Sequence, residues 1–154
     1  MKKTQIFSSA IFLLFLTFAF VIDRVVKYFA LEYLKNDILI VDGVLKLSLQ
    51  KNTGIAFSIG LPIEIQYILF PVLACVGLYC IIKYFDLGKL FVLIASGSIA
   101  GAALGNFFDR VFYGHVIDYI SVSYFPVFNF ADIIIVCGIF LIIVFYDKIK
   151  RVQI

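Results

Sequence analysis

Two acidic residues, Asp118 and Asp132, stand in apolar surroundings in the second half of the chain. Asp118 lies within the run VIDYI (residues 116–120), and a solvated loop rarely has such a composition. Two carboxylates a few ångströms apart cannot both ionise cheaply, so they can share a proton. One then acts as general base on a water while the other acts as general acid. The pair therefore predicts amide hydrolysis without a metal or a covalent nucleophile.

Further polar side chains gather at the same ends of the apolar segments as these acids. They are Asp23, Lys27, Asn52, Asn106, Asp109, Arg110 and Asn129. Asn106 and Arg110 are four residues apart and share a helix face, with Asp109 three residues after Asn106. We expect one polar network here. The alternative is that these groups merely lie at the membrane surface, as Lys35 and Glu64 do.

Asp132 has a structural alternative of its own. Asn129 and Asp132 have the spacing of a helix N-cap and its third residue. Against that, the apolar segment is expected to begin near Val127, which places Asp132 about five residues, or ~7 Å, inside it. A carboxylate at that depth is a functional candidate by default.

The elements that must position these groups are membrane helices. The chain has 154 residues, 64% hydrophobic and 15% charged, with a mean hydropathy of +1.10. Soluble domains are nearer to about 45–50% apolar, and neither disorder nor nucleic-acid binding fits these numbers. A spanning helix needs about 20 apolar residues. Four segments qualify, at residues 6–22, 61–82, 90–108 and 127–146.

The distribution of charge predicts the topology. With a cytoplasmic N-terminus, the inner segments carry seven Lys and Arg and two acids, and the outer segments six bases and eight acids. Five of the six outer bases lie in one long loop, where the positive-inside rule is weak. We therefore expect both termini in the cytoplasm and one integral membrane domain, residues 1–154.

The first outer loop is long enough to fold, and residues 36–59 predict a small extracytoplasmic β-sheet. Leu45, Leu47 and Leu49 alternate with polar residues, as in a half-buried strand. Asp42-Gly43 predicts a type I′ hairpin turn. We expect the sheet to lie on the membrane, with its leucines towards the membrane or the substrate.

Small residues and cysteines point to packing. Gly97, Gly101 and Gly105 recur every four residues and predict close contact with another helix. The three cysteines all lie in apolar runs and are expected to pack as small hydrophobes rather than to form disulfides. His115 is the only histidine, so we expect no metal site and no cofactor.

Together these residues resemble the bacterial lipoprotein signal peptidases (signal peptidase II), aspartic peptidases of the cytoplasmic membrane. The resemblance covers nearly the whole chain. Four blocks carry it: Asp23 with Lys27; NTGIAF at 52–57; Gly101, Leu104-Gly105-Asn106, Asp109-Arg110, Gly114, Val116 and Asp118; and FNFAD at 128–132. Ala102 stands where the family often has Gly, and Tyr119 where Phe is common.

The resemblance implies a catalytic pair, Asp118 and Asp132, that cleaves prolipoproteins just before a diacylglyceryl-modified cysteine. It also implies residues that bind substrate or support the pair: Asp23, Lys27, Asn52, Gly54, Asn106, Asp109, Arg110, Asn129 and Ala131. The expected partners are the prolipoprotein and membrane lipids. We expect a multi-pass monomer in the bacterial inner membrane with its active site at the extracytoplasmic face.

Two other classes of protein are alternatives to a peptidase. A small four-helix proton-coupled transporter would place its key acid near the bilayer midplane, open to each side in turn. Here the centres of the four predicted spans lack acids. A non-catalytic scaffold would need no cluster of Asp and Asn residues.

Overall fold

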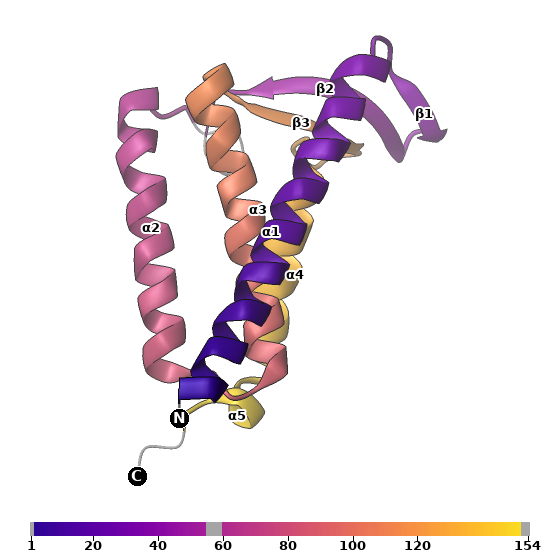
Figure 1. Ribbon diagram of the computed structural model, residues 1–154. Coiled ribbons are helices and arrows are strands. Elements are labelled where there is room, and N and C mark those ends of the chain that lie inside the picture. The colour runs from indigo at the N-terminus through magenta and orange to yellow at the C-terminus, as the bar shows by residue number, and fades with distance from the viewer. Residues whose placement is uncertain (1, 55–59, 152–154) are drawn as a thin grey trace.

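A computed structural model describes residues 2–54 and 60–151, with side chains from residue 6 onwards. Helices predominate, and three short strands lie at one end of them (Figure 1). In chain order the elements are α1 (Lys2–Tyr33), β1 (Ile38–Val41), β2 (Leu45–Asn52), α2 (Ile63–Tyr84), α3 (Leu90–Tyr113), β3 (Val116–Val122), α4 (Phe130–Val144) and α5 (Tyr146–Ile149).

Within the described residues, three helices are long and apolar enough to cross a membrane: Ile6–Tyr33 of α1, α2 and α3. This makes the chain a multi-pass membrane protein. The first predicted span ended at residue 22, whereas α1 continues unbroken to Tyr33. The predicted segment 127–146 forms a shorter helix, α4, of 15 residues, followed by the short α5. A fourth crossing therefore stays a prediction.

Helix α3 packs closely against α1, as the glycine spacing predicts. A Cβ added at Gly97 or Gly101 would collide with the backbone of α1 near Phe12 or Leu16. Gly138 of α4 lies in the same way against the side chain of Ile99 on α3. Helix α3 thus contacts both α1 and α4, and small residues permit the approach on each side.

The sheet is antiparallel, in the order β1-β2-β3. Its third strand comes from the second loop, which the sequence analysis did not assign to the sheet. Gln50 of β2 pairs with Asp118 of β3, and Asn52 pairs with Val116. The sheet therefore brings Asn52 and Asp118 to the same edge of the molecule. Residues 55–59 of the predicted β region, which include part of the NTGIAF motif, lie outside the described residues.

The hairpin between β1 and β2 is not the predicted type I′ turn. That turn needs positive φ at both central residues. Among the described non-glycine residues only Tyr124 has a positive φ, so Asp42 does not meet this requirement, whereas Gly43 has φ +66°. The connection has three residues, 42–44, closed by the Val44 N–H donating to the Val41 carbonyl at 3.0 Å.

Two of the three leucines of β2 also differ from expectation. Leu47 and Leu49 pack on a small buried cluster of Ala30, Leu34 and Tyr119. They hold the sheet against the last turns of α1 instead of presenting a free face to membrane or substrate. The exposed apolar strand is β1, in which all four side chains are exposed.

The two ends of the molecule are formed by different elements. The start of α1, the α2–α3 connection and α5 lie at one end, and the sheet lies at the other (Figure 1). The backbone N–H of Asp86 donates to Ile149 at 2.9 Å, which ties the α2–α3 connection to α5. The start of α1 and the short helix α5 thus lie at the same end of the molecule (Figure 1).

The cysteines are unpaired, but they are not core residues. Cys75 of α2 and Cys137 of α4 are exposed on the outer surfaces of their helices, and Cys80 is half-buried. The prediction that they pack as buried hydrophobes is wrong for the first two. On a membrane helix an apolar side chain need not face the protein interior, because lipid is as apolar as the core.

Candidate active site

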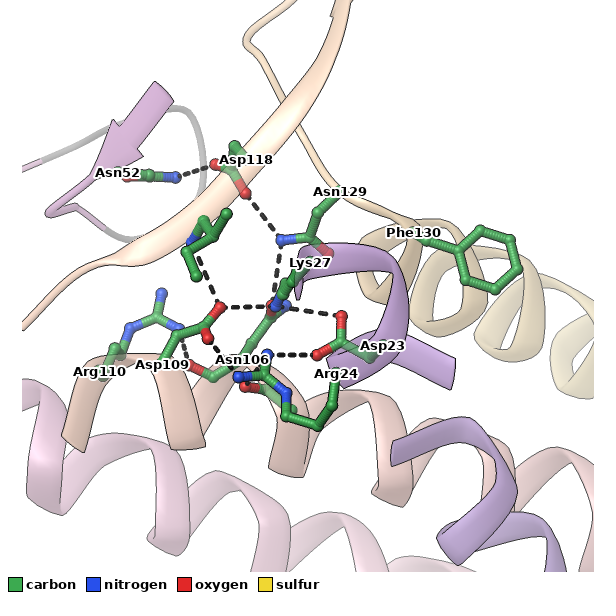
Figure 2. Close-up of polar contacts among 12 residues, drawn as sticks. Asp23, Arg24, Lys27, Asn52, Asn106, Asp109, Arg110, Asp118, Asn129 and Phe130 are labelled. Carbon is green, nitrogen blue, oxygen red and sulfur yellow. Dashed lines mark hydrogen bonds and ion pairs between the residues drawn. The ribbon is translucent and has the colours of Figure 1, made fainter. Parts of the chain in front are cut away.

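Asn129, the N-cap residue of α4, contacts both Asp118 and Asp132. Its contact with Asp118 is shown in Figure 2. The Asn129 amide Nδ2 donates to Asp118 Oδ1 at 2.7 Å, and its backbone N–H donates to Asp132 Oδ2 at 3.1 Å. One residue thus contacts both carboxylates, one on strand β3 and the other on helix α4. The two acids that the sequence analysis singled out belong to one hydrogen-bonded cluster.

The N-terminus of α4 is a complete capping box. Asn129 Oδ1 accepts from the Asp132 N–H at 3.1 Å, and Asp132 reciprocates through the Asn129 N–H. The capping alternative is therefore confirmed, and Asp132 lies in the first turn of α4, not five residues inside a helix. Its second oxygen, Oδ1, accepts from Asn106 Nδ2 at 2.8 Å. Asp132 caps the helix with one oxygen and joins the polar cluster with the other.

Strand β3 is tied directly to this helix start. The Tyr119 hydroxyl accepts from the Phe130 N–H at 3.1 Å, and Ile120 exchanges backbone hydrogen bonds with Phe128. Burial raises the pKa of Tyr119 to about 12, so its hydroxyl remains protonated at neutral pH. Ala131, the neighbour of Asp132, is fully buried. These contacts fix the strand that carries one acid relative to the helix that carries the other.

Asp118 is buried, with 2% of its surface exposed. Burial raises the pKa of its carboxyl group, because water no longer solvates the charged form. Hydrogen bonds donated by Asn52 (to Oδ2, 2.9 Å) and Asn129 pull the pKa of Asp118 down, whereas the nearby charge of Asp132 raises it. The net direction is upward, which suits a carboxyl group that gains and loses a proton.

Asn106 of α3 connects the acids to α1. Its Oδ1 accepts from Lys27 Nζ at 2.7 Å and from Asn129 Nδ2 at 3.0 Å, while its Nδ2 donates to Asp132. An ammonium group can only donate, so it fixes the orientation of the amide: oxygen towards Lys27, nitrogen towards Asp132. Lys27 therefore determines which atom of Asn106 faces the acid.

Lys27 belongs to a buried ion cluster between α1 and α3 (Figure 2). Its Nζ lies 3.1 Å from Asp23 Oδ1 and 2.7 Å from Asp109 Oδ2. Arg24 contacts the other oxygens of both acids, each at 2.6 Å. Two acids and two bases compensate each other, as buried charges require. Asp109 also accepts from the Ile117 N–H at 3.2 Å, which links the cluster to β3.

Arg24 was missed by the sequence analysis, which counted it only as a loop charge. Its guanidinium lies 4.9 Å from the centre of the Phe108 ring, in a cation–π contact. The available signal in the sequence was that Arg24 directly follows Asp23. Both residues lie on α1, which extends beyond the predicted end of the span at residue 22. Gly105 is needed at this point, since a Cβ there would collide with the carboxylate of Asp23.

Arg110 lies on the other side of Asn106. Its Nη1 donates to the Asn106 carbonyl at 3.0 Å and its Nη2 to the Gly54 carbonyl at 3.3 Å. The Gly54 N–H donates to Asn52 Oδ1 at 2.9 Å, so the Asn52 amide nitrogen is left to face Asp118. The Arg110 Nε donates to Gln66 of α2, a second residue that sequence reasoning missed. A glutamine inside an apolar span was the available signal.

All eleven residues nominated from the sequence thus belong to connected elements at the sheet end of the molecule. Their arrangement comprises two carboxyl groups with every oxygen hydrogen-bonded, amide groups of fixed orientation, and compensated charges behind them. Such an arrangement can hold a water and a peptide bond between an acid and a base.

The chain is similar to known proteins in both sequence and structure. Residues 15–147 match the family model described as signal peptidase (SPase) II. A lipoprotein signal peptidase of Chlorobaculum tepidum is 35% identical over 157 residues, covering 91% of this chain and 96% of the relative. One from Clostridium novyi is 34% identical over 140 residues, covering 86% and 94%. A bacterial membrane enzyme solved by the in meso method superposes with a TM-score of 0.77 at 30% identity, over 89% of this chain and 87% of that one.

Proposed function

The chain belongs to the signal peptidase II family, and on that premise we propose that Asp118 and Asp132 are its catalytic pair. Family membership makes the protein a membrane peptidase that removes signal peptides from lipoproteins. The observation that carries the proposal is the contact of Asn129 with both carboxylates. It supports a pair held close enough to share a proton.

The reaction needs one ionised and one protonated carboxyl group. The ionised group takes a proton from water as the water oxygen attacks the carbonyl carbon, and the protonated group gives its proton to the carbonyl oxygen. When the C–N bond breaks, the first group returns its proton to the leaving nitrogen. The second group recovers a proton from the tetrahedral intermediate, so the pair ends as it began.

The surrounding amides keep this pair in place. The side-chain amides of Asn52, Asn106 and Asn129 donate to both oxygens of Asp118 and to one of Asp132, and the Asn129 backbone N–H donates to the other. Positioning of this kind supplies a large part of a rate enhancement. The remaining supporting residues are Asp23, Lys27, Gly54, Asp109, Arg110 and Ala131, which hold these amides or the adjoining backbone, or bind substrate.

The substrate is a prolipoprotein whose cysteine carries a diacylglyceryl group, and cleavage falls just before that cysteine. The polar cluster lies at one end of long apolar helices. A lipid anchor would hold the scissile bond at this depth, since each buried methylene contributes ~0.8 kcal/mol. An unmodified precursor would lose that positioning.

The site faces the outside of the bacterial inner membrane, with both termini in the cytoplasm. The location of α5 and the start of α1 at the same end supports this topology. It requires α4 with the residues that follow it to make the fourth crossing, in a single domain that acts as a monomer.

The test is incubation of the purified protein with a prolipoprotein in two forms, with and without the diacylglyceryl group. We expect release of the signal peptide from the lipidated form far faster than from the other, and mass spectrometry should place the new N-terminus at the modified cysteine. Equal rates for both forms would refute the role assigned to the lipid. No release from either would refute the assigned substrate.

A further inference from the structure

Gln66 is a buried amide on a helix whose other side chains are exposed or half-buried. Of the 22 residues of α2 it is the one buried side chain, with 1% of its surface exposed. A polar group in apolar surroundings is costly unless its hydrogen bonds are made. An apolar residue would be less costly to bury at this position unless the amide makes its hydrogen bonds.

All the principal hydrogen-bonding groups of Gln66 are used. Its Nε2 donates to the carbonyls of Thr53 at 2.8 Å and Leu61 at 2.6 Å. Its Oε1 accepts from Arg110 Nε at 2.8 Å. Because a guanidinium can only donate, and the two carbonyls can only accept, the amide has a single satisfactory orientation. Gln66 thus joins α2, α3 and the chain that follows β2.

Each of these partners leads to one of the two acids. Arg110 donates to the carbonyl of Asn106, and the amide of Asn106 donates to Asp132. Thr53 lies between Asn52, which donates to Asp118, and Gly54, whose N–H orients the Asn52 side chain. Gln66 therefore contacts Arg110, which is hydrogen-bonded to the residue that supports Asp132. It also contacts Thr53, which is next in sequence to the residue that supports Asp118.

We propose that Gln66 is a positioning residue of this peptidase, which holds the Arg110 guanidinium and the Thr53–Gly54 backbone in register with the two acids. It acts through other residues and does not take part in the bond-breaking steps. This proposal rests on the proposed function, in which Asp118 and Asp132 carry out the reaction.

The test is a double-mutant cycle in the full-length protein, with lipidated prolipoprotein as substrate. We expect Gln66→Leu to lower kcat/KM about 10- to 100-fold, because a buried charged donor loses its acceptor and a small displacement at a catalytic site is costly. Arg110→Lys keeps the positive charge but lacks the Nε–H. On that background Gln66→Leu should cost clearly less than it does in the wild-type protein, since the contact with Arg110 is already lost and only the hydrogen bonds to the Thr53 and Leu61 carbonyls remain to be broken.

Two further variants distinguish the loss of the hydrogen bond that orients Arg110 from other changes in the contacts around Gln66. Gln66→Glu keeps an acceptor for Arg110 Nε and gives up both donor N–H groups, so it should be more active than Gln66→Leu. Tyr67→Phe is the matched control. The Tyr67 hydroxyl donates to the backbone carbonyl of Arg110 at 3.1 Å and does not contact the guanidinium, so its removal should leave kcat/KM nearly unchanged.

Melting temperatures of the wild-type protein, Gln66→Leu, Arg110→Lys and the double variant provide a second double-mutant cycle, which does not depend on activity. The two substitutions should lower the melting temperature non-additively, because they break the same hydrogen bond. If the wild-type protein cleaved no prolipoprotein, the proposed function would fall, while this thermal cycle would still test the Gln66–Arg110 contact. If Gln66→Leu does not fold, Gln66→Met, of similar length, takes its place.

Three results would overturn the proposal. One is full activity of the folded Gln66→Leu protein. The second is the same fold-loss of kcat/KM on the wild-type and Arg110→Lys backgrounds. The third is Gln66→Glu activity no higher than that of Gln66→Leu, which would show that the orientation of Arg110 is not what Gln66 supplies.

Discussion

Helix α3 has two unlike neighbours. Towards α1 it presents Gly97 and Gly101, which allow the two backbones to meet, and Gly105, which makes room for the Asp23 carboxylate in a buried ion cluster at the end of the contact. Towards α2 the contact is less extensive, and the buried part of α2 is the single side chain of Gln66. The α1–α3 pair is a rigid support for the polar cluster, whereas α2 is attached mainly through hydrogen bonds near its ends.

This difference has energetic consequences. Close-packed backbones cannot yield to an added methyl group, and a buried ion cluster cannot lose one member without leaving a charge uncompensated. Exposed side chains of α2 can change with little cost. Substitutions on the α1 side of α3 should therefore impair folding and activity together, while those at exposed positions of α2 should affect neither appreciably.

The largest effect is expected from Lys27→Met. It leaves the carboxylates of Asp23 and Asp109 facing Arg24 alone, and it removes the donor that orients Asn106. Breaking a buried ion pair in this way costs about 3–5 kcal/mol. We expect loss of peptidase activity and a strongly lowered melting temperature in detergent.

The matched control is Lys83→Met in the last turn of α2, where the lysine lies over the Tyr79 and Tyr84 rings. It should change neither activity nor melting temperature appreciably. Equal effects of the two substitutions would contradict the contrast between the two neighbours of α3.

A smaller effect is expected from Gly101→Ala. The new Cβ would collide with the Leu16 carbonyl of α1, and overpacking of this kind costs about 1–3 kcal/mol. Gly77→Ala on α2 is the matched control, because no atom lies within 4 Å of the Cβ that it adds. We expect a lowered melting temperature for the first and an unchanged or raised one for the second. The reverse order would mean that α1 and α3 do not meet closely.

A pH effect without a folding effect is expected from Asn52→Leu. The hydrogen bond from Asn52 favours the ionised form of Asp118 and so lowers its pKa. Without that bond the pKa of Asp118 rises further above its ordinary value. The bell-shaped pH profile of kcat/KM should therefore shift to higher pH, with little change in melting temperature. A shift to lower pH would contradict the assigned environment of this acid.

The smallest effects are expected from chelators and from removal of the cysteines. Among the described residues, no group of three or more His, Cys, Asp or Glu side chains is arranged to hold a metal ion. Cys75 and Cys137 are exposed on helix surfaces away from the polar cluster. Activity should survive EDTA and replacement of all three cysteines by alanine. Loss of activity in EDTA that added zinc restores would contradict a reaction carried by carboxyl groups alone.

The sequence was most informative where chemistry restricts the choice of residue. Apolar segments of membrane length and ionisable groups among apolar neighbours are rare, so three helices and the nominated residues could be located. Asn129 and Asp132 could be read either as a helix cap or as part of a site, and the structure gives them the contacts of both.

Other features depend on partners distant in sequence. Strand β3 has seven residues, four of them β-branched, but its place in the sheet depends on pairing with β2, about 70 residues earlier in the chain. Arg24 and Gln66 look like an ordinary loop charge and an isolated polar residue until α1, α2 and α3 are brought together. The turn at residues 42–44 was misjudged because Asp-Gly favours several turn types.

The most direct measurement of the central claim is the activity of Asp118→Asn, Asp132→Asn and the double variant on lipidated prolipoprotein. Each single substitution removes a titrating group while nearly preserving its shape, so each should lower kcat by at least about 10²-fold in a protein that still folds. If the two acids act as one unit, the double variant should be little worse than either single variant. Substantial residual activity in either single variant would contradict the catalytic pair.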